Sequence, residues 1–161
     1  MSLRGSTVIA LALATPVSAA AAEPADQKSE LYVLSGTCTA FKIDDTDDTS
    51  RCQDKLVSFT LPNGRVGFIF AFGKMMATFS GNGADQTRLP DGHVSQPIDA
   101  LRLVDTDKDP GKVESISSTG ACVYGNPFAG VTTVSCAVTA RQGVFRAEFV
   151  TDGTPPYTSS G

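Results

Sequence analysis

The chain has 161 residues, 41% of them hydrophobic, which is enough to bury the core of one domain. Its 17 acidic residues outnumber its 13 basic ones, and no cluster of Lys and Arg indicates a nucleic-acid-binding protein. A single His and four Cys leave few of the side chains on which most catalytic metal sites and nucleophilic active sites depend.

Residues 1–22 predict a secretory signal peptide. Arg4 supplies one positive charge, residues 8–14 form an apolar run, and Pro16 precedes an alanine-rich region suited to cleavage. The apolar run is shorter than the roughly 20 residues that span a bilayer, so no membrane insertion is expected after cleavage. Residues 23–30 are polar and predict a flexible leader. We therefore expect a bacterial protein that is periplasmic or secreted.

Residues 31–151 predict a single all-β domain. No segment after the signal peptide keeps a helical apolar period, whereas short β-rich stretches alternate with turns that contain Gly or Asn. We expect eight or nine short antiparallel strands, arranged as a sandwich or a small barrel. These strands are predicted within residues 31–41, 56–61, 65–72, 75–80, 94–104, 113–124, 131–140 and 144–150.

Three finer features follow from the same patterns. Ser58 and Thr60 alternate with apolar residues and are expected to face solvent. The alternation within residues 94–104 shifts near Ala100, which indicates a β-bulge. Residues 152–161, with two consecutive prolines, predict a flexible tail.

The four cysteines fall into two equally spaced pairs. Cys38 and Cys122 each end a Gly-x-Cys sequence, and Cys52 and Cys136 follow them 14 residues later. In both halves a strand, a Gly-containing turn and a Phe-containing strand come next, which suggests a pseudo-repeat, with coincidence as the alternative. An even number of thiols in an exported chain favours disulfides. Of three possible connectivities, the spacing favours Cys38–Cys52 and Cys122–Cys136.

No catalytic centre and no cofactor are predicted. His93 is the only imidazole, no Gly-x-Ser-x-Gly sequence surrounds a serine, and His93 is therefore expected to be an exposed loop residue. Carboxylates such as Asp99, Glu114 and Glu148 leave a hydrolase as the least favoured alternative, because the sequence does not place them across a cleft.

An acidic loop provides weak calcium candidates but no predicted metal site. Asp105, Asp107 and Asp109 alternate as in the first half of a calcium-binding EF-hand loop. Pro110 stands where such a loop needs Gly, and Ile116 stands where it needs Glu. Solvated turns are the favoured interpretation.

The loop after residue 123 is the main candidate for binding. Tyr124, Asn126 and Phe128 lie between the cysteines of the second pair, where a disulfide would rigidify the loop and lower the entropic cost of binding. We expect this loop to bind an envelope or extracellular protein, as an inhibitor or accessory module does. The sequence does not identify the partner or the oligomeric state.

A carrier of a small apolar ligand is the alternative. An eight-stranded barrel is wide enough to hold one small ligand. This interpretation predicts a continuous internal cavity lined by Phe68, Phe70, Met75 and Phe79. A packed core made of the same residues is the competing interpretation.

Overall fold

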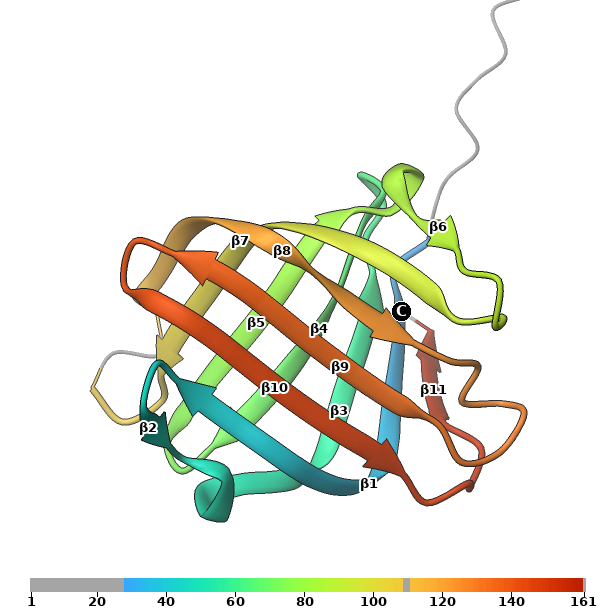
Figure 1. Ribbon diagram of the computed structural model, residues 1–161, viewed down its shortest axis with the longest axis horizontal. Coiled ribbons are helices and arrows are strands. Elements are labelled where there is room, and N and C mark those ends of the chain that lie inside the picture. The colour runs from blue at the N-terminus through green and yellow to red at the C-terminus, as the bar shows by residue number, and fades with distance from the viewer. Residues whose placement is uncertain (1–27, 109–110, 161) are drawn as a thin grey trace, which may run out of the picture.

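The computed structural model describes residues 28–108 and 111–160, and the predicted signal peptide lies outside this part of the chain. The described residues form strands joined by turns and by the short 3-10 helices η1 (Thr49–Arg51) and η2 (Gly83–Asp85), as Figure 1 shows. The strands are β1 (Glu30–Ile43), β2 (Thr46–Asp47), β3 (Cys52–Thr60), β4 (Arg65–Phe72), β5 (Met75–Asn82), β6 (Thr87–Arg88), β7 (Val94–Asp105), β8 (Val113–Tyr124), β9 (Thr133–Ala140), β10 (Gly143–Thr151) and β11 (Tyr157–Ser160).

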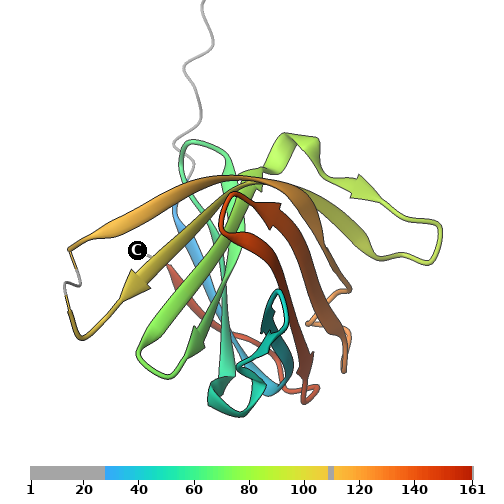
Figure 2. The same cartoon turned by 60° about the vertical axis from the view of Figure 1, so that its left-hand side comes forward.

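Eight of these strands form a closed antiparallel barrel. Their order is β1, β3, β4, β5, β7, β8, β9 and β10, so each long strand pairs with the next one in the sequence. β10 pairs with β1 between Gly36↔Thr151 and Ile43↔Phe145, and this pairing closes the sheet. The all-β prediction is confirmed, and of the two expected architectures the structure has the barrel, seen from two sides in Figures 1 and 2.

Three register shifts interrupt the pairing of the barrel strands. One lies between Cys52 and Leu56, where β3 pairs with β4. The other two are β-bulges that affect which side chains face the interior. The bulge expected near Ala100 is present between Ile98 and Ala100, where β7 pairs with β8. A second bulge, which the sequence pattern does not indicate, lies between Cys38 and Ala40, where β1 pairs with β10. Because a bulge shifts the alternation by one residue, Phe41 and Cys38 are both buried although three positions separate them.

The C-terminal stretch differs from the predicted flexible tail, because Tyr157–Ser160 form β11. This strand pairs with residues 30–33 of β1. β10 pairs with β1 only from Gly36 onward, so the beginning of β1 would otherwise present an unpaired edge. β11 runs in the direction of β10 and continues the wall after an interruption at residues 152–156.

Both disulfides have the pairing that the spacing favours. Cys38–Cys52 connects β1 to β3, and Cys122–Cys136 connects β8 to β9. In each half a further strand follows the bridged pair, β4 in the first half and β10 in the second. Each half of the barrel therefore contains one disulfide-bridged pair of strands. No described cysteine is free.

Side chains fill the middle of the barrel. Phe70 and Phe79 meet edge to face with ring centroids 5.6 Å apart, an arrangement that adds to the gain from burying them. Leu56, Leu101 and Phe149 are fully buried beside them. The interior is thus a packed core over most of its length, and it differs at the two ends.

Candidate functional site

One end of the barrel, which we call the closed end, is filled by aromatic side chains. It is the end at which β4 turns into β5 and β9 turns into β10. Phe41 and Phe72 stack there with ring centroids 4.0 Å apart, and Phe145 is buried at the same end. All three rings belong to the packed core, which therefore extends to the closed end.

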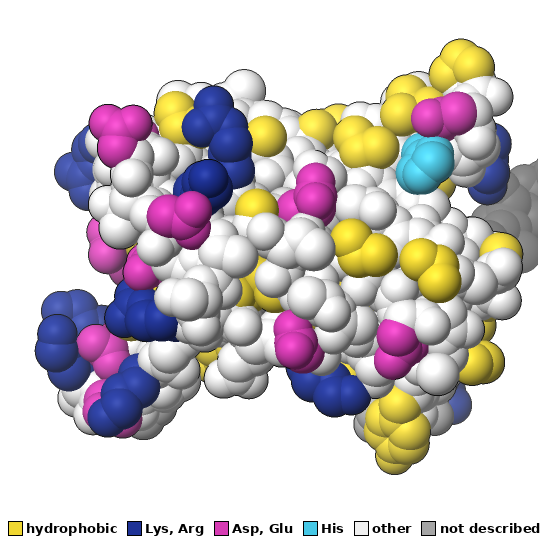
Figure 3. Space-filling view, turned by 60° about the horizontal axis from the view of Figure 1, so that its bottom comes forward, with side chains coloured by type: hydrophobic (Ala, Val, Ile, Leu, Met, Phe, Trp, Pro, Cys, Tyr) yellow, Lys and Arg dark blue, Asp and Glu magenta, His cyan; other side chains and the backbone are white. Residues whose placement is uncertain are grey.

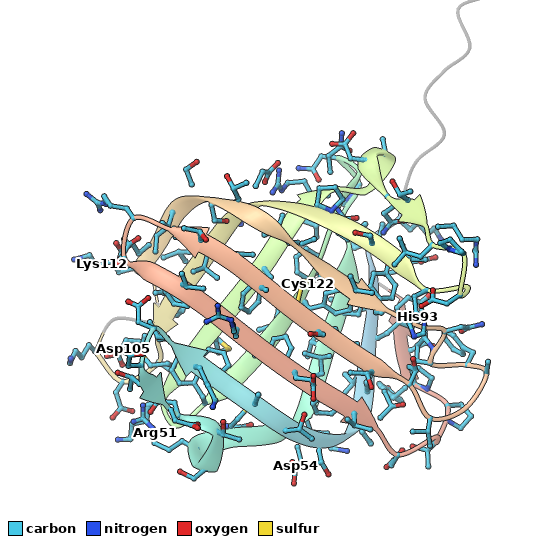
Figure 4. The ribbon with its side chains drawn as sticks, in the orientation of Figure 1. Arg51, Asp54, His93, Asp105, Lys112 and Cys122 are labelled. Carbon is cyan, nitrogen blue, oxygen red and sulfur yellow. A yellow bond between two sulfur atoms is a disulfide. The ribbon has the colours of Figure 1, made fainter. Side chains whose placement is uncertain are left out.

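Charged turns cover the closed end. Lys42 pairs with Asp47 at 3.1 Å, Arg51 pairs with Asp48 at 2.9 Å, and Lys74 pairs with Asp107. Figure 4 places Arg51, Asp105 and Lys112 at this end and His93 at the opposite one. In Figure 3 the charged side chains gather toward the left, whereas His93 and several hydrophobic side chains lie toward the right.

The other end, which we call the mouth, contains a cavity of about 700 Å³ that opens to solvent. It is the end at which β3 turns into β4 and β8 continues into the loop of residues 125–132. Leu34, Phe68 and Val134 are buried and line the cavity, so they form its floor. A cavity of this size lies within the range of about 300–1,000 Å³ that is typical of small-molecule sites.

Ser58 and Thr60 line this cavity, so the prediction that they face solvent is wrong. Side chains on a strand alternate between two faces, and both residues share the inward face of the fully buried Leu56. Their small polar side chains leave the mouth hollow, where larger apolar residues would have extended the core.

Four aromatic rings line the mouth in two pairs. Tyr32 of β1 meets Phe128 of the 125–132 loop edge to face, with centroids 5.6 Å apart. Phe68 of β4 meets Tyr124 of β8 in the same manner at 5.0 Å. The rings bring together three separate strands and a loop, and they offer a mainly apolar surface to a ligand.

The hydroxyl groups of the two tyrosines are hydrogen-bonded. Tyr124 Oη accepts a hydrogen bond of 2.8 Å from Gln86 Nε2, and burial raises the pKa of Tyr124. Tyr32 Oη donates to Glu30 Oε2 at 3.1 Å, and this bond, together with partial burial and the negative charge of Glu30, raises the pKa of Tyr32. Both phenols therefore stay protonated at neutral pH, and the tyrosines add no charge to the cavity.

The loop of residues 125–132 is held from below and from the side. The Cys122–Cys136 disulfide joins the strands that carry the loop, one inward position below the paired residues Tyr124 and Val134. The side chain of Thr151, which is buried, accepts a hydrogen bond from Thr132 N at 2.8 Å. These contacts restrict the loop before any ligand binds, which lowers the ordering cost of binding.

A fully buried glutamine lies below the rim. Gln96 is the next inward residue after Val94, a lining residue of β7. Its Nε2 donates to the carbonyl oxygens of Asn82 and Pro97, at 3.0 and 2.7 Å. Its Oε1 has no hydrogen-bond partner among the described residues, and Gln96 itself does not line the cavity.

The structure brings all three predicted binding residues to the mouth. Tyr124, Asn126 and Phe128 line the cavity together. What they bind stays a prediction, but they form one wall of a hollow site rather than an isolated loop. The sequence analysis did not identify Arg88 and Gln86, which also line the cavity, because they lie in the irregular connection between β5 and β7.

The predicted position of a ligand cavity is wrong for three of its four residues. Phe68 lines the cavity, but Phe70 and Phe79 belong to the packed core. Met75 packs against that core from the start of β5, at the closed end. The hollow part of the barrel is therefore its mouth, and it does not continue through the middle.

The calcium candidates take part in turn contacts. Asp105 Oδ1 accepts hydrogen bonds from the backbone N–H groups of Asp107 and Lys108, and the bond from Asp107 is the main reason why the pKa of Asp105 is lowered. Asp107 pairs with Lys74, and Asp109 lies outside the described residues. Within residues 28–108 and 111–160, no group of three potential ligands could hold a metal ion.

The other residues considered for catalysis are dispersed. His93 is partly exposed, and its Nδ1 lies 3.2 Å from Asp91 Oδ2 in a shallow depression beside the mouth. Asp99 pairs with Arg65, Glu114 accepts from Gln142, and Glu148 accepts from Thr39. None of the three carboxylates lines the cavity.

The comparisons with known proteins assign no class to this chain, so its class is defined here by its fold and its site. No protein-family model, no curated protein and no solved structure matches this chain. Among the described residues, no helix has the length and apolarity needed to cross a membrane. The two disulfides indicate an oxidising location outside the cytoplasm. The chain is thus a disulfide-bridged, eight-stranded barrel with one open mouth.

Proposed function

We propose that this protein binds a small, mainly apolar molecule in the mouth of its barrel, as a carrier or sequestering protein without catalytic chemistry. The cavity of about 700 Å³, with an aromatic lining, is the observation that carries the proposal. Ligand sites are typically concave and mostly apolar, with a few polar groups that orient the ligand. The mouth has this composition, since Gln86 and Asn126 accompany the aromatic rings.

The proposed location is the periplasm or the extracellular medium of a bacterium. The basis is the signal-peptide pattern of residues 1–22, together with the disulfides. A carrier in such a compartment has a simple physical use, because apolar molecules dissolve poorly in the aqueous space between or outside membranes.

A second candidate is an envelope or extracellular protein bound at the rim. Three apolar side chains at this end are well exposed, namely Phe128 at 56%, Val131 at 69% and Tyr157 at 71%. Exposed aromatic residues are common anchors of protein interfaces. Native mass spectrometry of the unreduced protein from its exported fraction separates the candidates, because a bound small molecule and a bound protein add very different masses.

The proposal is tested by binding of N-phenyl-1-naphthylamine, an uncharged dye that fluoresces in apolar sites. We expect saturable binding of one dye molecule and its loss in Ser58→Phe, because a phenyl ring at this inward position would fill the cavity between Tyr32 and Phe68, the cross-strand neighbours of Ser58. The matched control is Ser135→Phe, on the exposed outer face of β9, which should bind as the unmodified protein does. Absence of binding, or equal binding by both variants, would contradict the proposal.

A further inference from the structure

A single charged side chain lines the cavity. Arg88 of β6 is the one charged residue among the described residues that do so. It pairs with Val94 in the register between β6 and β7, and paired residues share a face of the sheet. Since Val94 also lines the cavity, the register places Arg88 on the cavity side of its strand.

The guanidinium group of Arg88 has no carboxylate partner. Its Nη1 donates to the carbonyl oxygen of Gly92 at 3.3 Å, and no carboxylate of the described residues lies within ion-pairing distance of it. Arg51 and Arg65 each pair with an aspartate. Among the described residues, Arg88 shares its lack of an ion pair with Arg102, Arg141 and Arg146, and it differs from them because it lines the cavity. Most of the five N–H donors of Arg88 are thus free to bind a planar anion such as a carboxylate, which accepts two parallel hydrogen bonds from a guanidinium.

Acidic groups lie near the lining on both sides of the mouth, but none of the described ones lines the cavity. Glu30 is bound by Tyr32 Oη at 3.1 Å, at the start of β1. β1 and β7 are four strands apart in an eight-stranded order, so Glu30 and Arg88, whose strand pairs with β7, stand on opposite walls. On the side of Arg88, Asp91 Oδ2 lies 3.2 Å from His93 Nδ1, and neither Asp91 nor Asp85 lines the cavity. Arg88 is therefore the charged group that a ligand in the cavity would meet.

The exposure of Arg88 suits a ligand that is apolar at one end only. Arg88 is exposed, whereas the floor residues Leu34 and Phe68 are buried. An anionic head at the rim keeps its contact with water, so binding avoids the cost of burying a charge. The apolar body can then leave water completely, which is the favourable part of the process.

We propose that the ligand is a hydrophobic carboxylate, with its apolar body in the barrel mouth and its carboxylate paired with Arg88. This inference rests on the function proposed above, because it needs the cavity to be a ligand site. It adds the chemical class of the ligand and the residue that selects it.

The test uses three amphiphiles with the same twelve-carbon chain below their micelle concentrations: dodecanoate, dodecanol and dodecyltrimethylammonium. Each displaces N-phenyl-1-naphthylamine from the intact, oxidised protein and from Arg88→Gln. We expect the substitution to weaken dodecanoate roughly three- to tenfold, the range for a partly exposed ion pair. Dodecanol should bind both forms equally. Arg88→Lys keeps the charge but loses the paired hydrogen bonds, so its affinity for dodecanoate should lie between those of the unmodified protein and Arg88→Gln.

Arg102→Gln is the control for net charge. Arg102 is exposed on the outer face of β7, so its replacement changes the protein charge by the same amount without touching the cavity. Dodecanoate affinity that is unchanged in Arg88→Gln, or tighter binding of the cation than of the anion, would overturn this inference and leave the proposed function intact. If none of the amphiphiles and no dye binds the unmodified protein, the proposed function itself fails.

Discussion

The closed end and the mouth are built from the same strands, and they differ in the size of the side chains that face inward. At the closed end Phe41 and Phe72 stack and exclude solvent. At the mouth Ser58 and Thr60 occupy the corresponding inward face of β3 and leave a cavity. Tightly packed interiors stabilise a fold, whereas a hollow site contributes less. We therefore expect the closed end to contribute most of the stability and the mouth to be the place of the proposed ligand binding.

The connections differ in the same sense. Charged connections cross the closed end, where ion pairs such as Lys42–Asp47 lie at the surface. At the mouth the 125–132 loop carries the exposed Phe128, whose ring contacts Tyr32. Surface ion pairs contribute little to stability, so the closed end depends on its aromatic core rather than on its charges.

The largest expected effect is a difference between the two ends in the stability lost when an aromatic side chain is removed. Phe41→Ala should lower the free energy of unfolding by about 3–5 kcal/mol, because it removes a fully buried ring. Phe128→Ala, at a side chain that is 56% exposed, should cost less than about 1 kcal/mol and yet weaken dye binding severalfold. Urea unfolding and dye titration of both variants measure the two quantities. Equal losses of stability would contradict the division between the ends.

The disulfides give a second, smaller contrast. Each closes a loop of about 15 residues, and removing either by paired Cys→Ala substitution should cost about 3 kcal/mol. Removal of Cys122–Cys136 should also weaken dye binding, because this bridge lies below Tyr124 and the 125–132 loop. Removal of Cys38–Cys52 should leave binding unchanged in the molecules that remain folded. Binding that depends on the first bridge and not on the second would reverse the contrast.

The smallest expected effect concerns acid stability. The hydroxyl and backbone N–H of Thr49, together with Lys42, lower the pKa of Asp47 to about 2. The fold therefore favours ionised Asp47, and its contribution is complete above about pH 4, the ordinary range of an aspartate, and is lost as the pH falls toward about 2. Asp47→Asn should flatten the pH dependence of the urea midpoint in this window. An unchanged profile would show that Asp47 does not contribute.

The same acid-stability measurement can be made on a second aspartate, which lies at the mouth. Asp152 also has a lowered pKa, caused first by the hydroxyl and then by the backbone N–H of Thr154. Asp152→Asn should change the same acid profile in the same direction. It should leave dye binding at neutral pH as it is, since Asp152 does not line the cavity.

Local patterns predict the strands of this protein well, for physical reasons. β8 has the bounds predicted from its β-rich run, and the parity shift near Ala100 corresponds to a bulge. The equal cysteine spacing predicts both disulfides, since two hairpins of equal length bring each pair together. Barrel closure cannot be predicted in this way, because β1 and β10 are distant in sequence and no local pattern encodes their pairing.

The inward face of β3 shows where alternation becomes ambiguous. Leu56 and Phe59 are both buried although they point to opposite faces. Phe59 is buried on the outside because its ring covers Gly67, where a Cβ would lie 2.9 Å from that ring and 2.1 Å from the carbonyl oxygen of Phe79. If Phe59 is assumed from the sequence to face inward, the alternation of the strand predicts that Ser58 faces outward, and this prediction is wrong. The cavity beside Ser58 is formed by several strands together, so the local pattern of β3 does not predict it. Arg88 is brought to the cavity by β6, a strand of only two residues, which is too short to show a pattern.

The most direct test of the account is a two-dimensional ¹⁵N–¹H spectrum of the oxidised protein, titrated with N-phenyl-1-naphthylamine. The naphthyl ring should shift the amide signals of residues that line the mouth, among them Phe68, Tyr124 and Phe128. Signals at the closed end, such as those of Phe41 and Asp47, should stay in place. Shifts centred on the closed end, or no shifts at saturating dye, would contradict the claim that the mouth of the barrel is a binding site for a small apolar molecule.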